Sequence, residues 1–214
     1  MKINIIPIYN NLQELDFRIL LALELNMKYR KWVPVMNIKK YIHLSTDKII
    51  YRLGILSKYK IVGKSLIPYE GYTLYILGYS FLSLRVYIKR GIFQKIGYNI
   101  KEKKNAVLFE VKKNDLLFSG NEKIFILKIN QSYNMNLKDI NEEKKKNQHR
   151  LLWTLKLKKQ SKHEYEIMKK LYPAVSIPKP IDYNRNTIVF EKTNGYLLSK
   201  IKLRNPIYYL NKIL

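Results

Sequence analysis

The 214-residue chain contains no cysteine, which excludes disulfide bonds and thiolate metal sites. Its three histidines, His43, His149 and His163, lie far apart in the sequence and are not accompanied by clusters of carboxylates. We therefore expect no metal site on these side chains and interpret them as surface or satisfied structural histidines.

Long apolar runs are also missing. No uninterrupted apolar stretch approaches the roughly 20 residues that a membrane span requires. The segment from Met1 to Tyr9 is apolar, but it is short, contains Pro7 and lacks a small-residue cleavage site, so it is not typical of a signal peptide. We expect an intracellular, soluble protein without a membrane partner.

Acidic residues are few: 16 Asp and Glu stand against 41 Lys and Arg, for a net charge of +25. Clustered lysines bind phosphate backbones because they release counterions, so the charge favours a polyanionic partner. Lys, Asn, Ile and Tyr are over-used together, however, as an A/T-rich genome produces, and this bias explains much of the excess. The charge supports an RNA partner without establishing one.

Residues 1–91 have the pattern of a winged helix-turn-helix domain. Three segments place apolar residues at helical spacing: Leu15, Ile19, Ala22 and Leu23; Val35, Ile38 and Ile42 after Pro34; and Ile49, Leu53 and Leu56 after a capping Ser45 or Thr46. Residues 61–62 and 72–74 predict two short strands around a loop with Pro68 and Gly71. A fourth helix, with Leu77, Phe81, Leu84 and Ile88, should end near Gly91.

A winged helix presents its third helix to a groove of nucleic acid. The residues predicted to face away from the core of this helix, or to lie on the wing, are Lys48, Tyr51, Arg52, Lys58 and Lys64. They indicate either phosphate contacts with structured RNA or only the solvated face of a lysine-rich protein. Winged helices also dock proteins, so the fold does not decide.

Residues 92–214 predict a second domain, which makes the chain α+β. Residues 107–111 and 124–129 are expected to form paired strands, and a long helix should run from about Leu151 to Leu171. The polar stretch 130–150 between them should be a flexible loop, because its composition cannot bury a core. Prolines at 173, 178 and 180 end the helix and lead into the last strands, and Asn205 begins a short terminal helix.

Lys128 ends an apolar strand, Glu164 follows on the long helix, and the apolar strand 187–191 comes next. This order resembles the nucleotide-binding lobe of a protein kinase, in which a strand lysine reaches the phosphates, a helix glutamate holds the lysine, and a strand leads to the adenine-binding hinge. The alternative for Lys128 is an edge-strand lysine that points to water.

Several short stretches extend the resemblance over both domains. In chain order they are Glu14–Arg18, Trp32–Pro34, Gly71–Leu74, Leu77–Tyr79, Ile96–Gly97, Leu127–Lys128, Trp153, Pro178–Arg185, Phe190–Glu191 and Asn194–Tyr196. Pro178–Arg185 is the most specific of them. From Leu12 to about Leu210 the chain resembles the RIO family of atypical serine/threonine protein kinases, in the subtype with an N-terminal winged helix.

The resemblance implies an ATP-binding lobe with Lys128 and Glu164 as the phosphate-holding pair. Glu166 competes with Glu164, but Trp153 aligns the helix so that Glu164 takes the family position. It also implies that Glu191 and Thr193 offer backbone groups to adenine. Phe190 fills the gatekeeper position with a bulky ring, and the family's flexible loop over the nucleotide falls on residues 130–150.

The family's glycine-rich loop falls on Lys101–Ala106, where lysines replace both glycines and the serine is lost. Glycines are needed there so that backbone amides can approach phosphate oxygens closely. One interpretation is that the loop still binds phosphate, with Lys104 attracting it by charge alone. A decayed cradle is the other interpretation, and we favour it.

No aspartate follows Asp182 and no acid follows Glu191, so the catalytic base and the metal-binding residues have no candidates there. We expect no catalytic residue, no Mg²⁺ held by this chain alone and no independent phosphotransfer. Either the chain is truly shortened and acts as a binding platform, or it is a fragment of a longer kinase.

The resemblance implies a monomeric factor of small ribosomal subunit biogenesis. Its partners would be the pre-ribosomal small subunit and its rRNA, with ATP as the ligand, in the nucleus, nucleolus and cytoplasm. The alternative is a winged-helix DNA-binding regulator whose C-terminal domain serves dimerisation or sensing.

Overall fold

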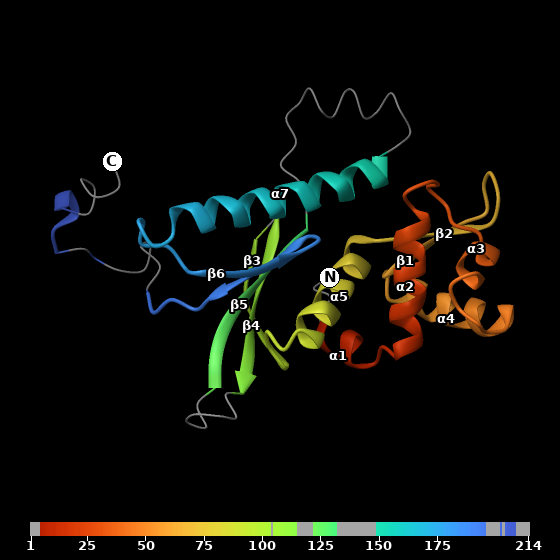
Figure 1. Ribbon diagram of the computed structural model, residues 1–214, viewed down its shortest axis with the longest axis horizontal. Helices are drawn as coiled ribbons and strands as arrows, with labels where there is room; N and C mark the ends of the chain where they lie inside the picture. The colour runs from red at the N-terminus through yellow and green to blue at the C-terminus, as the bar shows by residue number, and fades with distance from the viewer. Residues whose placement is uncertain are drawn as a thin grey trace.

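The computed structural model of the chain describes residues 5–103, 105–114, 122–131, 149–195, 202 and 204–208. Helices and a small sheet occupy one end of the molecule, and a larger antiparallel sheet with one long helix occupies the other (Figure 1). The chain is α+β, with a winged helix followed by the sheet and helix of a kinase-like lobe.

The N-terminal end contains five helices and two strands. They are α1 (Ile5–Asn10), α2 (Glu14–Asn26), α3 (Val35–Lys39), α4 (Thr46–Lys58), β1 (Val62–Ser65), β2 (Gly71–Leu74) and α5 (Ile76–Lys89). The predicted winged helix is confirmed, with α4 as its third helix and β1–β2 as the antiparallel wing. The short helix α1 was not predicted, and the second wing strand begins at Gly71, which we had placed in the loop.

The helices form where apolar residues recur on one side. Ile19 and Leu23 on α2, and Ile49 and Leu53 on α4, are completely buried at the predicted spacing. Helix α2 begins with a capping box, in which the Gln13 backbone N–H donates to the Asp16 carboxylate at 2.8 Å. Burial of these faces fixes how α2 and α4 cross.

The second half contains a five-stranded antiparallel sheet in the order β3-β4-β5-β7-β6. Its elements are β3 (Lys95–Lys103), β4 (Ala106–Asn114), β5 (Glu122–Asn130), α7 (His149–Leu171), β6 (Pro180–Asn184) and β7 (Thr187–Glu191). The predicted strand pair, long helix and terminal helix, here at 206–208, are confirmed. Most of the predicted loop 130–150 lies outside the described residues.

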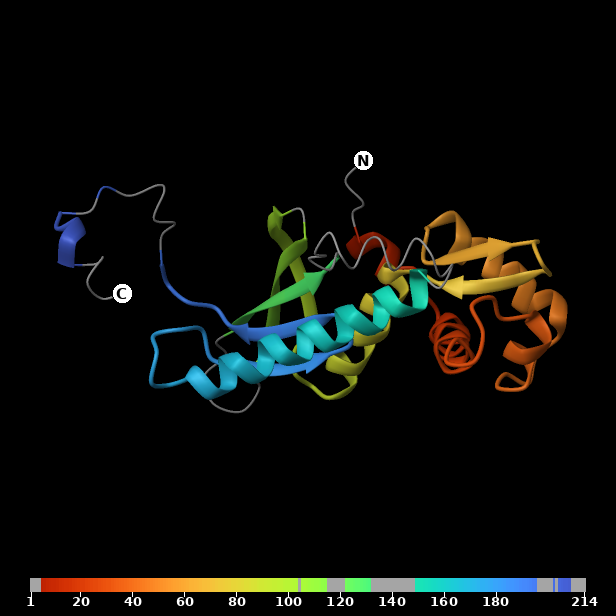
Figure 2. The same ribbon diagram turned by 90° about the horizontal axis from the view of Figure 1, so that it is seen from above.

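One apolar cluster joins the two halves. It contains Phe17 and Phe81 of the helical end together with Phe109, Leu127 and Val189 of the sheet. Helix α7 runs beside the sheet, with its N-terminal end directed towards the winged helix in both views (Figures 1 and 2). Within the described residues, no helix is long and apolar enough to cross a bilayer.

Candidate nucleotide-binding site

Lys128 and Glu164 form the predicted pair. The Lys128 ammonium lies 2.5 Å from a Glu164 carboxylate oxygen, and the two side chains are 24% and 31% exposed. The competitor Glu166 instead contacts Lys162, one turn away on the outer side of α7, at 3.6 Å. The pairing is therefore as the sequence predicted, whereas its role in binding ATP stays a prediction.

The sheet register sets the position of Lys128. Leu108 on β4 and Ile188 on β7 lie directly opposite Lys128 on the two neighbouring strands. Side chains opposite one another point to the same face of a sheet, so the ammonium emerges from an apolar surface. It is a central-strand lysine with a partner, not the edge-strand lysine of the alternative interpretation.

Helix α7 brings Glu164 to this face. Leu157 and Ser161 are completely buried at helical spacing on α7, and Glu164 lies one turn further along. The Asn130 side chain at the end of β5 donates to the Ser161 hydroxyl at 2.9 Å. Further along, the rings of Tyr165 on α7 and Tyr183 on β6 lie 5.0 Å apart. These contacts fix the helix against the sheet.

The hinge residues lie where β7 ends. The Glu191 N–H donates to the Lys179 carbonyl at 2.9 Å, so this N–H is already occupied. Glu191 and Thr193 are both exposed. Their role as adenine contacts stays a prediction.

A second ion pair, which the sequence analysis missed, lies beside the hinge. Lys192 contacts Glu110 of β4 at 2.9 Å, and the Tyr98 hydroxyl donates to the same carboxylate at 3.2 Å. The hydrogen bond from Lys192 holds the pKa of Glu110 below its ordinary range despite the burial of this side chain. In the sequence, Glu110 is a single acidic residue within the apolar run 106–111, and this feature could have indicated that it needs a cationic partner.

The lysine-substituted loop is a tight hairpin. Strand pairing continues to the partners Lys103 and Ala106, so only two residues connect β3 and β4. Lys104 lies outside the described residues. Gly97 is needed for close packing, because a Cβ there would lie 3.0 Å from the Glu110 carbonyl oxygen.

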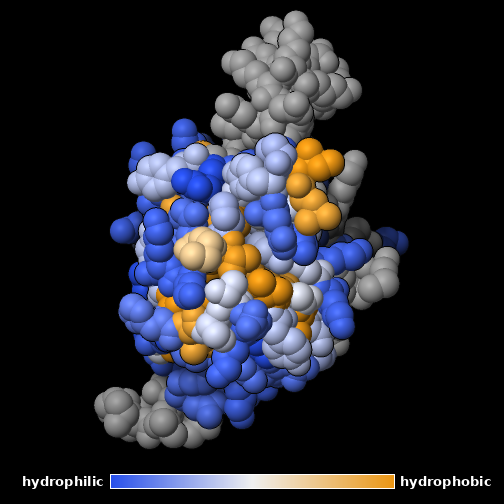
Figure 3. Space-filling view, turned by 90° about the vertical axis from the view of Figure 1, so that its right-hand side faces the viewer, coloured by the Kyte–Doolittle hydropathy of each residue, from blue (hydrophilic) through white to orange (hydrophobic). Residues whose placement is uncertain are grey.

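The third helix of the winged helix exposes three of the predicted nucleic-acid contacts: Lys48, Tyr51 and Lys58. On the wing, Lys64 is 46% exposed and contacts Glu70 at 2.8 Å, so its charge is partly neutralised. The winged-helix end of the molecule mixes hydrophilic and apolar side chains on its surface (Figure 3). A nucleic-acid role for these residues stays a prediction.

The expected orientation of Arg52 is wrong. Its side chain is 13% exposed and forms an ion pair with the completely buried carboxylate of Asp16, to which Arg52 Nε donates at 2.8 Å. Position 52 is one helical turn after Ile49, at the flank of the buried face of α4, so its side chain reaches α2 rather than solvent. The sequence alone did not show where α2 and α4 cross.

These features define a class of protein: a winged helix joined to the nucleotide-binding lobe of a protein kinase. The family model for the Rio2 N-terminal domain matches residues 9–90, and that for the RIO domain matches residues 108–212. Together the two models span most of the chain.

Similar proteins match this chain over most of its length. The chain is 32% identical over 195 residues to the serine/threonine-protein kinase rio2 of Dictyostelium discoideum, covering 89% of this chain and 36% of the relative. It is 27% identical over 187 residues to the RIO-type serine/threonine-protein kinase Rio2 of Methanocaldococcus jannaschii, covering 83% and 63%. The solved Rio2 kinase–ADP/Mg²⁺–phosphoaspartate complex from Chaetomium thermophilum superposes with a TM-score of 0.78 at 22% identity, covering 97% and 61%.

The chain belongs to the RIO family of atypical serine/threonine protein kinases, in the branch with a Rio2 N-terminal domain. It spans between 36% and 63% of the length of these relatives. The family assignment favours the kinase-like interpretation of the second domain over a DNA-binding regulator with a sensor domain.

Proposed function

We propose that this chain is a RIO-kinase-like factor that binds ATP through Lys128 and Glu164 and acts with RNA in small ribosomal subunit assembly. The observation that carries the nucleotide site is the 2.5 Å contact between these two side chains on β5 and α7. Kinases of this layout need the same pair in place before they bind phosphates productively. We also propose that the factor acts in the nucleus, nucleolus and cytoplasm.

Lys128 supplies charge for the phosphates. The ammonium keeps two further N–H donors beside the one that it gives to Glu164, and these can reach phosphate oxygens. Glu164 restricts the lysine to one position, so the entropy cost of ordering its long side chain is met before ATP arrives. The exposed hinge residues Glu191 and Thr193 would then offer backbone groups to adenine.

We propose binding without metal-dependent catalysis by this chain alone. Among the residues that the structure describes, no group of three or more His, Asp or Glu side chains could hold a metal ion. Glu164 and Glu110 are already held by lysines, so Mg²⁺ would arrive with ATP and not at a preformed cage. Mg²⁺ neutralises charge on the phosphates when it is bound with the nucleotide.

The RNA part of the proposal rests on the exposed face of α4 and on the net charge of +25. Lys48 and Lys58 offer cations, and Tyr51, which is 69% exposed, offers a ring on which an unpaired base can stack. Selective binding to ribosomal precursors cannot come from charge alone, since charge attracts any polyanion.

Affinity capture from the protein's own cells tests the assembly role. We expect pre-ribosomal RNA of the small subunit to be enriched over messenger and transfer RNA, and the double variant Lys48→Glu/Lys58→Glu to lose that enrichment. Lys159→Glu/Lys169→Glu on α7 makes the same change in charge elsewhere and serves as the control. Equal recovery of all RNA classes would refute a specific assembly role.

A further inference from the structure

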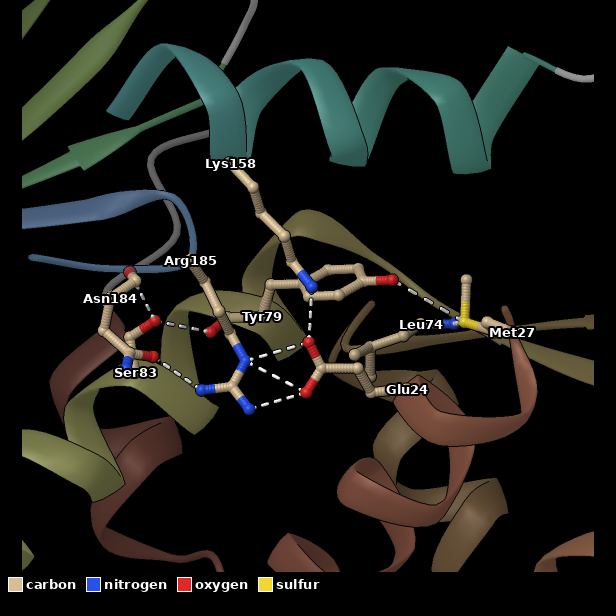
Figure 4. A network of polar contacts seen from close by, with 8 residues as sticks. All are labelled: Glu24, Met27, Leu74, Tyr79, Ser83, Lys158, Asn184 and Arg185. Carbon is tan, nitrogen blue, oxygen red and sulfur yellow. Dashed lines mark hydrogen bonds and ion pairs between the residues drawn. The ribbon is translucent and has the colours of Figure 1, made fainter. Parts of the chain in front are cut away.

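Glu24 of α2 lies at the junction between the winged helix and the kinase-like sheet. Its carboxylate accepts from Lys158 of α7 at 2.5 Å, and from Arg185, in the turn between β6 and β7, at 2.6 Å and 3.0 Å (Figure 4). Only 13% of the Glu24 side chain and 16% of the Arg185 side chain are exposed. One carboxylate thus joins three elements that are far apart in the sequence.

The surroundings of Glu24 keep it ionised. Burial alone would raise its pKa, but the hydrogen bonds and charges of Arg185 and Lys158 outweigh burial and hold the pKa below its ordinary range. The Lys158 ammonium also lies 4.8 Å from the ring centre of Tyr79 on α5. Lys158 is therefore held by the winged helix from two sides.

Arg185 shows that the junction is specific. Its φ is +51°, in the left-handed region that glycine and asparagine adopt at low cost and arginine rarely does. The strain is offset by the fork of its guanidinium on Glu24 and by a hydrogen bond of 2.6 Å to the Asn184 side chain. Ser83 on α5 donates to the Asn184 carbonyl at 3.0 Å and fixes the same turn.

A second, uncharged set of contacts runs parallel to the first. Asn186 donates to the Ser80 hydroxyl of α5 at 2.9 Å and to the Asn130 carbonyl at 3.0 Å, and Asn130 in turn donates to Ser161 of α7 at 2.9 Å. All four residues are buried. These buried hydrogen bonds restrict how α5, β5 and α7 can move relative to one another, although the Asn186 side-chain oxygen has no partner among the described residues.

Helix α7 is thus attached at two successive turns, at Lys158 and Ser161, and its next turn carries Glu164. A shift or rotation of the helix would therefore move Glu164 relative to Lys128, since a helix moves as a stiff body. We propose that Glu24 of the winged helix is a positioning residue for the nucleotide site: through Lys158 it holds α7 where Glu164 reaches Lys128. The inference rests on the proposed ATP site.

The test compares two equivalent substitutions on α7. Lys158→Met breaks the link to Glu24 but leaves the Glu24–Arg185 fork and keeps an unbranched side chain over Tyr79. Lys162→Met on the next turn removes the same charge from a surface pair with Glu166. We prefer Lys158→Met to Glu24→Gln because the latter leaves two cations without their partner and could unfold the chain.

Two readouts separate positioning from stability. The first is the Lys128 ammonium signal in the NMR spectrum of lysine-labelled protein, assigned by its loss in Lys128→Arg. The second is the dissociation constant for ATP. We expect Lys158→Met to shift or broaden the Lys128 signal and to weaken ATP binding about three- to tenfold, the range of coupling through a packed contact. Lys162→Met should change neither, and Lys158→Met should have no further effect in a Lys128→Ala background.

Each outcome decides one question. An ATP affinity that falls in Lys128→Ala but not in Lys158→Met overturns the inference and leaves the ATP site standing. If ATP binding does not depend on Lys128 at all, the proposed function fails, and the ammonium signal alone decides whether Lys158 positions the pair. A lower melting temperature of Lys158→Met with an unchanged Lys128 signal shows a structural role only and also overturns the inference.

Discussion

Replacing Arg52 by methionine removes the guanidinium that holds the Asp16 carboxylate and leaves a completely buried negative charge without its cation. Breaking a buried ion pair from one side typically costs 3–5 kcal/mol. Asp16 keeps the Gln13 N–H as a donor and Arg52 is 13% exposed, so we expect the lower end of this range, about 3 kcal/mol. For a chain of this length, that loss corresponds to a fall in melting temperature of roughly 6–12 °C.

Thermal unfolding followed by circular dichroism at pH 7 measures this loss. Lys48→Met, on the exposed side of the same helix, is the control and should change stability by less than about 0.5 kcal/mol. Adding Asp16→Asn to Arg52→Met removes the buried charge and should recover part of the loss. A fall of less than about 2 °C in Arg52→Met would refute our assignment of Arg52 to the core of the winged helix.

Lys48→Glu with Lys58→Glu should weaken binding to ribosomal RNA fragments and reduce the salt slope by about two, at an unchanged melting temperature; an unchanged slope would rule out this face. The purified chain should transfer no phosphate from ATP with or without Mg²⁺, because the sequence contains no acid after Glu191, whereas autophosphorylation that survives removal of contaminating kinases would contradict this. Urea unfolding across pH should show stability falling below pH 4.5, because the pKa of Glu24 and of Glu110 is lowered in the folded state and protonation then favours the unfolded chain. The same series should show stability falling above pH 10. Burial raises the pKa of Tyr9 to about 12 and also raises the pKa of Tyr79, so these side chains lose their protons at lower pH in the unfolded chain than in the folded one. A stability profile that is flat at both ends of the pH range would contradict these pKa shifts.

The sequence predicted those features that depend on local periodicity or on order along the chain. The buried faces with Ile19 and Ile49 follow from helical spacing, and the Lys128–Glu164 pair follows from the order of strand, helix and strand. Neither prediction requires knowledge of how distant elements cross.

Features that depend on such crossings were not predicted. Arg52 was placed on the surface because its partner Asp16 lies on another helix, and the contact depends on the angle between α2 and α4. Glu24, Lys158 and Arg185 each have the sequence pattern of a surface residue. They become one partly buried cluster only because α7 and the β6–β7 turn meet α2.

The proposed nucleotide site depends on Lys128, and a thermal-melt titration with ATP measures what this side chain contributes to binding. With both family glycines replaced by lysines, we expect a dissociation constant near the millimolar range, about −4 kcal/mol. At tenfold excess over that constant, ATP should stabilise the fold by about 1.4 kcal/mol, a rise of a few degrees. Lys128→Ala should abolish this rise, and Lys162→Ala should keep it. A rise that persists in Lys128→Ala would mean that ATP binds only as a polyanion on a basic surface, and Lys128 would then not belong to a nucleotide site.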